Sequence, residues 1–121
     1  MLRESEHQRK IMQWSRQSAV LKRYPELSLL YHIPNGGRRD PIEARHLKEQ
    51  GVKPGVPDLH LPVARKGYHG LYIELKTEKG RATNKQKQWL SELVKQGYYA
   101  VVCHGWQDAQ AVLMWYLNET M

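Results

Sequence analysis

A segment from Gly70 to Thr77 places charged residues inside an otherwise apolar strand pattern. Its β-branched and aromatic residues favour a strand, in which successive side chains point to opposite faces of a sheet. The leucines and the isoleucine therefore share one face, while Tyr72, Glu74 and Lys76 share the other. An unpaired carboxylate or ammonium group is costly to bury, so this second face requires partner charges, a water-filled cleft or a metal ion. Any fold of this chain has to provide one of the three.

Helix and strand patterns alternate along the rest of the chain, which predicts a mixed sheet flanked by helices. Helices are expected at residues 4–24, 41–50, 83–96 and 106–117. Strands are expected at residues 27–33, 58–63, 70–77 and 98–104. Because a short connection joins the second and third strands, we expect these two to form an antiparallel hairpin. The predicted fold class is thus α/β, with about four strands in one sheet.

The balance of charges points to a polyanionic partner. The chain of 121 residues carries 19 Lys and Arg against 12 Asp and Glu, a formal net charge of +7. This length is typical of one domain, which we expect to span residues 1–121. A small domain with such an excess of positive charge attracts polyanions, and nucleic acid is the first candidate.

Several other classes of protein are disfavoured. The single cysteine, Cys103, excludes an internal disulfide and a zinc site made of cysteines, and it fits a reducing compartment. No apolar run is long enough to span a membrane, and the N-terminus is too polar for a signal peptide. The Gly36-Gly37 turn lacks the fingerprints of nucleotide-binding loops, so no nucleotide cofactor is expected. We therefore expect an intracellular, cytoplasmic protein.

A second carboxylate belongs to the predicted hairpin. Asp58 begins the first of its strands, directly after Gly55-Val56-Pro57. A register that places Asp58 beside Glu74 would hold two carboxylates a few ångströms apart, where they repel strongly unless a proton or a cation lies between them. Hard oxygen ligands of this kind suit Mg²⁺ or Mn²⁺, which keep several waters and accept a phosphate oxygen as a further ligand. The sequence therefore predicts a divalent metal site.

Taken in order, these residues resemble the VRR-NUC domain of the PD-(D/E)xK nuclease superfamily. That family carries a glutamate on an early helix, a Pro-Asn-Gly turn, a Gly-x-Pro-Asp strand start, a Glu-x-Lys strand, and a glutamine followed by an aromatic residue. Here the corresponding residues are Glu6, Pro34–Gly36, Gly55–Asp58, Glu74–Lys76, and Gln86 with Trp89. The resemblance covers nearly the whole chain and implies a restriction-endonuclease-like fold and a metal-dependent DNA endonuclease.

The resemblance also implies which residues hold the metal ion. Asp58 and Glu74 would bind it, with the backbone carbonyl of Leu75 as a further ligand. Glu6 would reach the ion from the first helix, directly or through water. A bound divalent ion polarises the scissile phosphate and lowers the pKa of a bound water, which gives a nucleophile near neutral pH.

Two further residues would complete the catalytic group. Lys76, on the same strand face as the second carboxylate, would orient the water or offset charge in the transition state. Gln86 would position water or phosphate at the start of its helix, although Gln88 competes with it for a place facing the site. Glu4 and Glu6 could instead both be first-turn carboxylates that favour the helix dipole.

Basic residues cluster in or beside the loops that are expected to flank the carboxylates. They are Arg38, Arg39, Lys53, Arg65, Lys66, Lys79, Arg81, Lys85 and Lys87. We expect Arg38, Arg39, Lys53, Lys79, Arg81, Lys85 and Lys87 to contact DNA phosphates on either side of the metal, with salt-sensitive binding. A solvated surface is the alternative interpretation.

The resemblance extends to the standalone members of the family from bacteriophages and prophages, which act as homodimers on branched DNA. We therefore expect a homodimer that resolves Holliday junctions in the cytoplasm of a phage-infected or prophage-bearing bacterium, because two cuts need two sites. One alternative is a nuclease for flaps, nicks or replication forks. The other is a non-catalytic DNA-binding module that keeps the fold and the basic surface.

Overall fold

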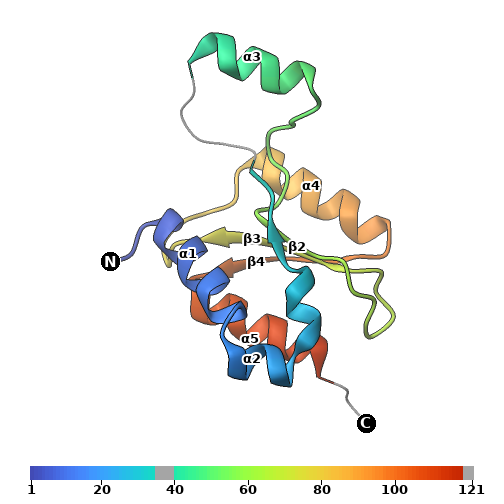
Figure 1. Cartoon of the computed structure of the whole chain (residues 1–121). Helices are drawn as coiled ribbons and strands as arrows, with labels where there is room; N and C mark the ends of the chain where they lie inside the picture. The colour runs from blue at the N-terminus through green and yellow to red at the C-terminus, as the bar shows by residue number, and fades with distance from the viewer. Residues whose placement is uncertain (35–39, 119–121) are drawn as a thin grey trace.

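Four strands form a single mixed sheet in the computed structural model, which describes residues 1–34 and 40–118 (Figure 1). Their order across the sheet follows the chain: β1 (Tyr31–His32), β2 (Leu59–Leu61), β3 (Leu71–Lys76) and β4 (Tyr99–His104). β2 is antiparallel to both β1 and β3, whereas β4 runs parallel to β3. The expected α/β fold and the antiparallel hairpin are both confirmed.

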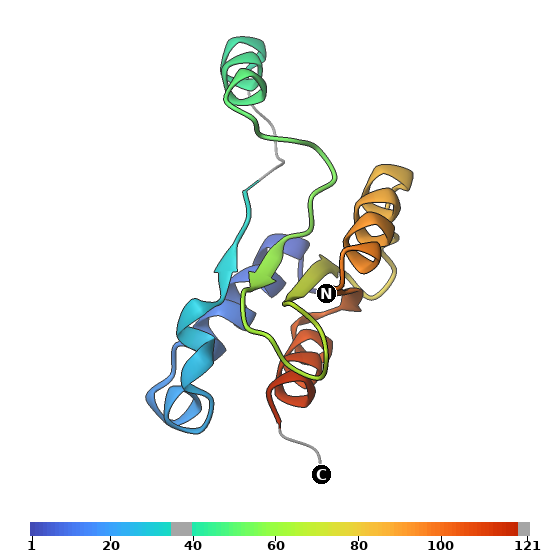
Figure 2. The same cartoon turned by 90° about the vertical axis from the view of Figure 1, so that its right-hand side faces the viewer.

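Helices cover the two faces of this sheet unequally. Their bounds are α1 (Glu4–Ser15), α2 (Ser18–Arg23), the 3-10 helix η1 (Pro25–Leu29), α3 (Pro41–Glu49), α4 (Asn84–Lys95) and α5 (Trp106–Leu117). α1 and α5 pack against β3, and α5 and α4 pack against β4. Figures 1 and 2 show α4 on the opposite side of the sheet from α5. None of the described helices is long and apolar enough to cross a membrane.

The hydrophobic core lies between the sheet and the face that α1 and α5 cover. Leu59 of β2 pairs with Ile73 of β3, and both side chains are buried there with Leu75. Ile11 of α1 and Leu113 of α5 complete this core from the helical side. Because strand side chains alternate, the same register sends Glu74 and Lys76 to the opposite face of the sheet.

Two expected elements in the N-terminal third differ from the structure. The single helix expected at residues 4–24 is broken after Ser15, whose hydroxyl donates to the carbonyl of Met12 at 2.8 Å, and extended Gln17 starts a second helix. The strand expected at residues 27–33 is largely wrong, since Pro25 opens a 3-10 helix and only Tyr31–His32 pair as β1. Tertiary packing decides this segment, because Leu27 and Leu30 are buried in the core.

α3 projects away from the rest of the molecule (Figures 1 and 2). It begins as expected, with the Asp40 carboxylate accepting a hydrogen bond from the Glu43 N–H at 2.8 Å and with Pro41 as the first helical residue. It ends at Glu49, shortly before Gly51, which has a φ of +104°. None of the α3 residues that the structure describes is buried.

Candidate active site

Three carboxylates from separate elements meet beside the C-terminal half of β3. Glu4 begins α1, Asp58 precedes β2, and Glu74 lies within β3. One carboxylate oxygen of each lies within 4.8 Å of those of the other two. The antiparallel hairpin brings Asp58 to this place, where its Oδ2 accepts a hydrogen bond from the N–H of Leu75 at 2.7 Å. We refer to Glu4, Asp58 and Glu74 as the acidic cluster.

Glu74 is the most buried member of the acidic cluster. The residue is 1% exposed, and neither carboxylate oxygen accepts a hydrogen bond from any described residue. Burial, together with the neighbouring negative charge of Asp58, raises the pKa of Glu74 to about 8. A buried carboxylate without donors is stabilised either by a proton or by a cation, and the oxygen ligands around it suit a divalent ion.

Lys76 supplies one positive charge to the same group. Its Nζ lies 3.4 Å from Oε2 of Glu74 and 3.9 Å from Oε2 of Glu4, and the residue is 8% exposed. When all four side chains are ionised, three negative charges face one positive charge, which leaves a local charge of −3 + 1 = −2. One divalent cation would balance that charge, so the residues present fit a metal ion.

The first helix contributes Glu4, not Glu6, to the acidic cluster. The Glu6 carboxylate turns away and accepts hydrogen bonds from the backbone N–H and the Nε of Arg3, both at 3.0 Å. These bonds lower the pKa of Glu6. Burial, with Asp58 nearby, raises the pKa of Glu4 against the opposing effect of Lys76. The expected position of Glu6 is therefore corrected, because this residue caps the start of α1.

His7 fixes the end of α1 that carries Glu4. It is 6% exposed, and its Nδ1 accepts a hydrogen bond from the N–H of Trp106, the first residue of α5, at 3.1 Å. The contact joins α1 to the start of α5, one helical turn from Glu4. The sequence interpretation overlooked His7 because its partner is a backbone group, which no spacing of metal ligands could reveal.

Gln86 is held by the start of its own helix. Its Oε1 accepts a hydrogen bond from the N–H of Thr83 at 2.8 Å, and its N–H donates to Oγ1 of Thr83 at 3.2 Å. This reciprocal pair is a capping box, which accounts for a glutamine at this position without any catalytic role. A role for Gln86 in positioning water or phosphate stays a prediction, as does the role of the Leu75 carbonyl as a metal ligand.

The seven residues expected to contact DNA fall into two groups. Lys53, Lys79, Arg81, Lys85 and Lys87 are exposed, and Arg38 and Arg39 lie outside the described residues. Arg65 and Lys66, the other two basic residues that were expected beside the carboxylates, lie in the β2–β3 connection, at the end of β3 opposite the acidic cluster. Arg65 pairs with Glu26 at 2.6 Å, and Nζ of Lys66 donates to the Asn118 carbonyl at 2.6 Å. The expectation that these two flank the carboxylates is therefore wrong.

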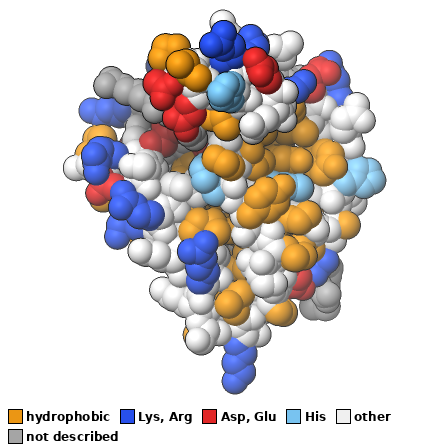
Figure 3. All heavy atoms as spheres, turned by 45° about the horizontal axis from the view of Figure 1, so that its top comes forward, with side chains coloured by type: hydrophobic (Ala, Val, Ile, Leu, Met, Phe, Trp, Pro, Cys, Tyr) orange, Lys and Arg blue, Asp and Glu red, His pale blue; other side chains and the backbone are white. Residues whose placement is uncertain are grey.

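An aromatic cluster continues the sheet face on which Glu74 lies. The His60 ring stacks on Tyr72 with centroids 4.2 Å apart, and the Tyr31 hydroxyl contacts Nδ1 of His60 at 2.8 Å. Tyr98 meets Tyr72 edge to face, and burial lowers the pKa of His60. Figure 3, which turns the top of Figure 1 forward, shows hydrophobic and histidine side chains gathered on that surface. The sequence interpretation did not foresee this cluster, although strand alternation already placed Tyr72 on the face of Glu74.

Comparison with known proteins identifies the family and supports the fold. No significant match is found among the curated proteins. The model of the VRR-NUC domain matches residues 2–107. A solved structure described as a VRR_NUC domain protein is 39% identical in sequence, with a TM-score of 0.80, over 97% of this chain and 89% of that chain. The chain therefore belongs to the VRR-NUC domain family and has the fold of a nuclease-type, DNA-processing domain.

Proposed function

We propose that this protein is an endonuclease that hydrolyses phosphodiester bonds of DNA with Mg²⁺ or Mn²⁺. The acidic cluster is the observation that carries the proposal, because it surrounds a buried Glu74 that lacks hydrogen-bond donors among the described residues. Lys76 adjoins two of the three carboxylates. A non-catalytic DNA-binding module would have no use for a buried carboxylate that destabilises the fold.

Each residue of the site has a specific task in this proposal. Asp58, Glu74 and Glu4 would hold the ion, with the Leu75 carbonyl as a further ligand. When bound, the ion supplies polarisation of the scissile phosphate and a lower pKa for an attacking water. Lys76 Nζ donates hydrogen bonds to that water or to the phosphate oxygens on which negative charge develops. The hydrogen bond from the Leu75 N–H fixes the orientation of the Asp58 carboxylate.

Removal of single carboxylates tests the proposal. Asp58→Ala and Glu74→Ala should each abolish cleavage of labelled DNA while DNA binding is retained, because loss of a negative charge does not weaken attraction for phosphates. Cleavage by the unmodified protein should require Mg²⁺ or Mn²⁺ and stop with a chelator. Wild-type cleavage rates in both variants would refute the assignment of the site.

We further propose that the enzyme acts as a homodimer on four-way junctions and that it is a family member of phage type. Two symmetric cuts require two sites related by a two-fold axis, which a homodimer provides. Exposed apolar residues that could lie in such an interface include Tyr31, Ile42, Val94 and Trp115, each at least 43% exposed. The alternative is a nuclease that is specific for flaps, nicks or replication forks.

Substrate comparison separates these possibilities. Labelled four-way junction, flap, nicked duplex and linear duplex are incubated with the protein at equal concentration. Symmetric nicks across the junction, together with a dimer mass in sedimentation, would support resolution by a homodimer. Preferred cleavage of flaps by a monomer would support the alternative and leave the metal site unaffected.

A further inference from the structure

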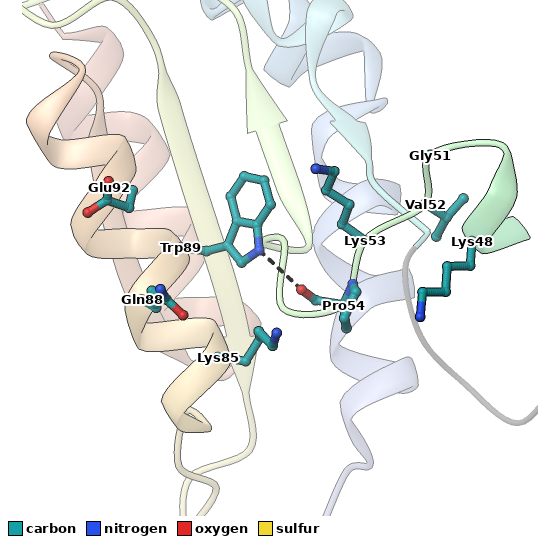
Figure 4. Close-up of a pocket in the computed structure, with 9 residues that line it drawn as sticks. All are labelled: Lys48, Gly51, Val52, Lys53, Pro54, Lys85, Gln88, Trp89 and Glu92. Atoms are coloured by element: carbon teal, nitrogen blue, oxygen red, sulfur yellow. Dashed lines mark hydrogen bonds between the residues drawn. The ribbon is translucent and has the colours of Figure 1, made fainter.

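A pocket of about 540 Å³ lies between α4 and the segment that leads from α3 towards β2 (Figure 4). That volume falls within the range usual for small-molecule sites. The described residues that line it are Lys48, Gly51, Val52, Lys53, Pro54, Lys85, Gln88, Trp89 and Glu92. The acidic cluster contributes none of these described residues, so the pocket is distinct from the proposed metal site.

The charges that line the pocket favour an anion. Three lysines, Lys48, Lys53 and Lys85, come from three different segments of the chain and line the pocket together with one glutamate, Glu92. The Glu92 carboxylate is already paired with Lys95 at 2.9 Å, so its own negative charge is partly balanced from outside the pocket. The lining charges therefore sum to 3 − 1 = +2.

The pocket also has an aromatic side chain in its lining. The indole of Trp89 lines the pocket together with Val52 and Pro54 (Figure 4). Lysines and an indole that line one pocket match a ligand that combines phosphate with a flat ring. Nucleotides are such ligands, because proteins that bind single strands place bases on aromatic side chains and phosphates on basic ones.

The wall of the pocket is held in place by backbone contacts. Nε1 of Trp89 donates a hydrogen bond to the Pro54 carbonyl at 3.1 Å. Gly55 follows with a φ of +88°, and a Cβ at this position would lie 2.5 Å from Cγ of Lys85 and 3.0 Å from Cδ1 of Trp89. The loop therefore approaches α4 as closely as a glycine permits. This contact fixes the indole without any ligand.

The pocket lies near the proposed site of cleavage. Pro54 precedes Asp58 by four residues, and four residues span at most roughly 14 Å. Nucleotides of a duplex strand follow one another at about 3.4 Å along the axis. The pocket is therefore within reach of a nucleotide only a few positions from the phosphate that would be cut.

We propose that this pocket binds an unpaired nucleotide of the DNA substrate, with its base against Trp89 and adjacent phosphates on Lys48, Lys53 and Lys85. The base must be unpaired because a base within a duplex has both faces covered by its neighbours. The inference rests on the proposed nuclease function, which it extends by giving the protein a preference for DNA with single-stranded character near the cut.

Photocrosslinking tests the contact with Trp89 in the unmodified protein. An oligothymidylate that carries 5-iododeoxyuridine is irradiated with the protein in the presence of a chelator, and the products are digested with trypsin. The tryptic peptide from Gln88 to Lys95 contains Trp89 as its aromatic residue. We expect the crosslink in this peptide. Crosslinks confined to other peptides would overturn the proposal.

Binding measurements test the lysines. Affinity for a blunt duplex and for the same duplex with a single-stranded tail is measured by fluorescence anisotropy, again with a chelator. Lys48→Ala combined with Lys53→Ala should weaken binding to the tailed DNA about tenfold and to the blunt duplex less than about twofold. On the tailed DNA, the slope of log affinity against log salt should fall by about 0.7 for each tail phosphate that is no longer bound. Lys22→Ala, on exposed α2 at the other end of the molecule, should leave both affinities unchanged.

The outcomes separate this proposal from the nuclease itself. Equal weakening on both DNAs would assign the lysines to a general duplex path, and unchanged binding to the tailed DNA would remove the pocket from the DNA; each result overturns the proposal. A protein that crosslinks as expected and cleaves no DNA with Mg²⁺ or Mn²⁺ would refute the nuclease and leave the pocket. A protein that cleaves junctions without this crosslink would refute the pocket alone.

Discussion

At the scale of single residues, the burial of Glu74 is the most unusual feature of the molecule. Glu74 is 1% exposed and is paired with Lys76 at 3.4 Å, but two further carboxylates lie beside it. The excess negative charge destabilises a folded chain unless something compensates for it. Core substitutions of equal size could fill the same volume without that penalty. A carboxyl group at this position is expected only if its negative charge has a function. The neighbouring carboxylates indicate that this function is to bind a cation.

The raised pKa of Glu74 predicts how stability depends on pH. The folded pKa of about 8 exceeds the ordinary value of 4.5, so the folded state binds the extra proton between these pH values. The metal-free protein should therefore lose stability as pH rises from about 4.5 to about 8. Glu74→Gln removes this loss, and we expect it to be more stable than wild type by roughly 1–3 kcal/mol at pH 8 in chelator.

Thermal denaturation at a series of pH values measures this effect. Glu78→Gln, an exposed residue in the turn after β3, is the matched control and should follow the wild-type curve. Mn²⁺ at pH 8 should raise the melting temperature of wild type and leave Glu74→Gln nearly unchanged. A wild-type melting temperature that rises between pH 5 and pH 8 in parallel with Glu74→Gln would contradict the prediction.

Lys76 should separate metal binding from cleavage. Its ammonium group lies within 4 Å of two carboxylates, so it competes with any cation for their charge. Lys76→Met should bind Mn²⁺ at least as tightly as wild type in calorimetry, because that competition is removed. Its cleavage rate should fall about 100-fold, since the donor to water or phosphate is gone. Weaker metal binding together with unimpaired cleavage would show that the roles are reversed.

At the scale of elements, α1 decides which of its two first-turn glutamates reaches the site. Glu4 joins the acidic cluster, whereas Glu6 caps the helix through Arg3. Glu4→Gln should weaken Mn²⁺ binding by at least about tenfold and slow cleavage. Glu6→Gln should lower the melting temperature slightly and leave Mn²⁺ affinity as in wild type. Titration calorimetry on this matched pair checks both, and the opposite pattern would restore Glu6 to the metal.

The same helix shows what the sequence could and could not predict. Strand alternation and the short β2–β3 connection were enough to bring Asp58 and Glu74 together, because both depend on local periodicity and hairpin geometry. The choice of Glu4 over Glu6 depends on Arg3, a residue that carries no typical capping signal. The position of α1 itself involves long-range contacts, namely the packing of Ile11 in the core and the hydrogen bond between His7 and Trp106, which are 99 residues apart in the chain.

Elements without a strong period were predicted least well. Residues 27–33 are apolar enough for a strand, yet tertiary burial of Leu27 and Leu30 favours a 3-10 turn that leaves Leu29 51% exposed. At the break after Ser15, the Ser15 hydroxyl donates to the Met12 carbonyl and Gln17 is extended, and neither feature follows from the spacing of apolar residues. By contrast, the bounds of α5 were predicted to the residue, because Gly105, which has a φ of +94°, stands immediately before the helix.

At the scale of the whole molecule, basic residues differ in how they are used. Arg65 and Lys66 lie in the β2–β3 connection and form contacts with Glu26 and Asn118. Lys79 and Arg81 lie in the connection that leaves β3 directly after Lys76, and both are exposed. The basic residues that give the chain its net charge of +7 are therefore not equally available to DNA. Lys79 and Arg81 follow β3 at the same end of the sheet as the acidic cluster.

This arrangement predicts a local effect of charge removal on DNA binding. Lys79→Ala combined with Arg81→Ala should lower the slope of log affinity against log salt on duplex DNA by about 1.8, which corresponds to two phosphates that are no longer neutralised. Arg16→Ala combined with Lys22→Ala removes the same charge from exposed positions of the α1–α2 region and should leave that slope unchanged. Binding to chelated protein over a range of salt concentrations measures both. Long-range attraction depends on net charge, whereas counterion release requires contact at the phosphates. Equal changes of slope in the two variants would therefore mean that DNA responds to the overall charge of the protein. In that case no defined DNA path passes the acidic cluster.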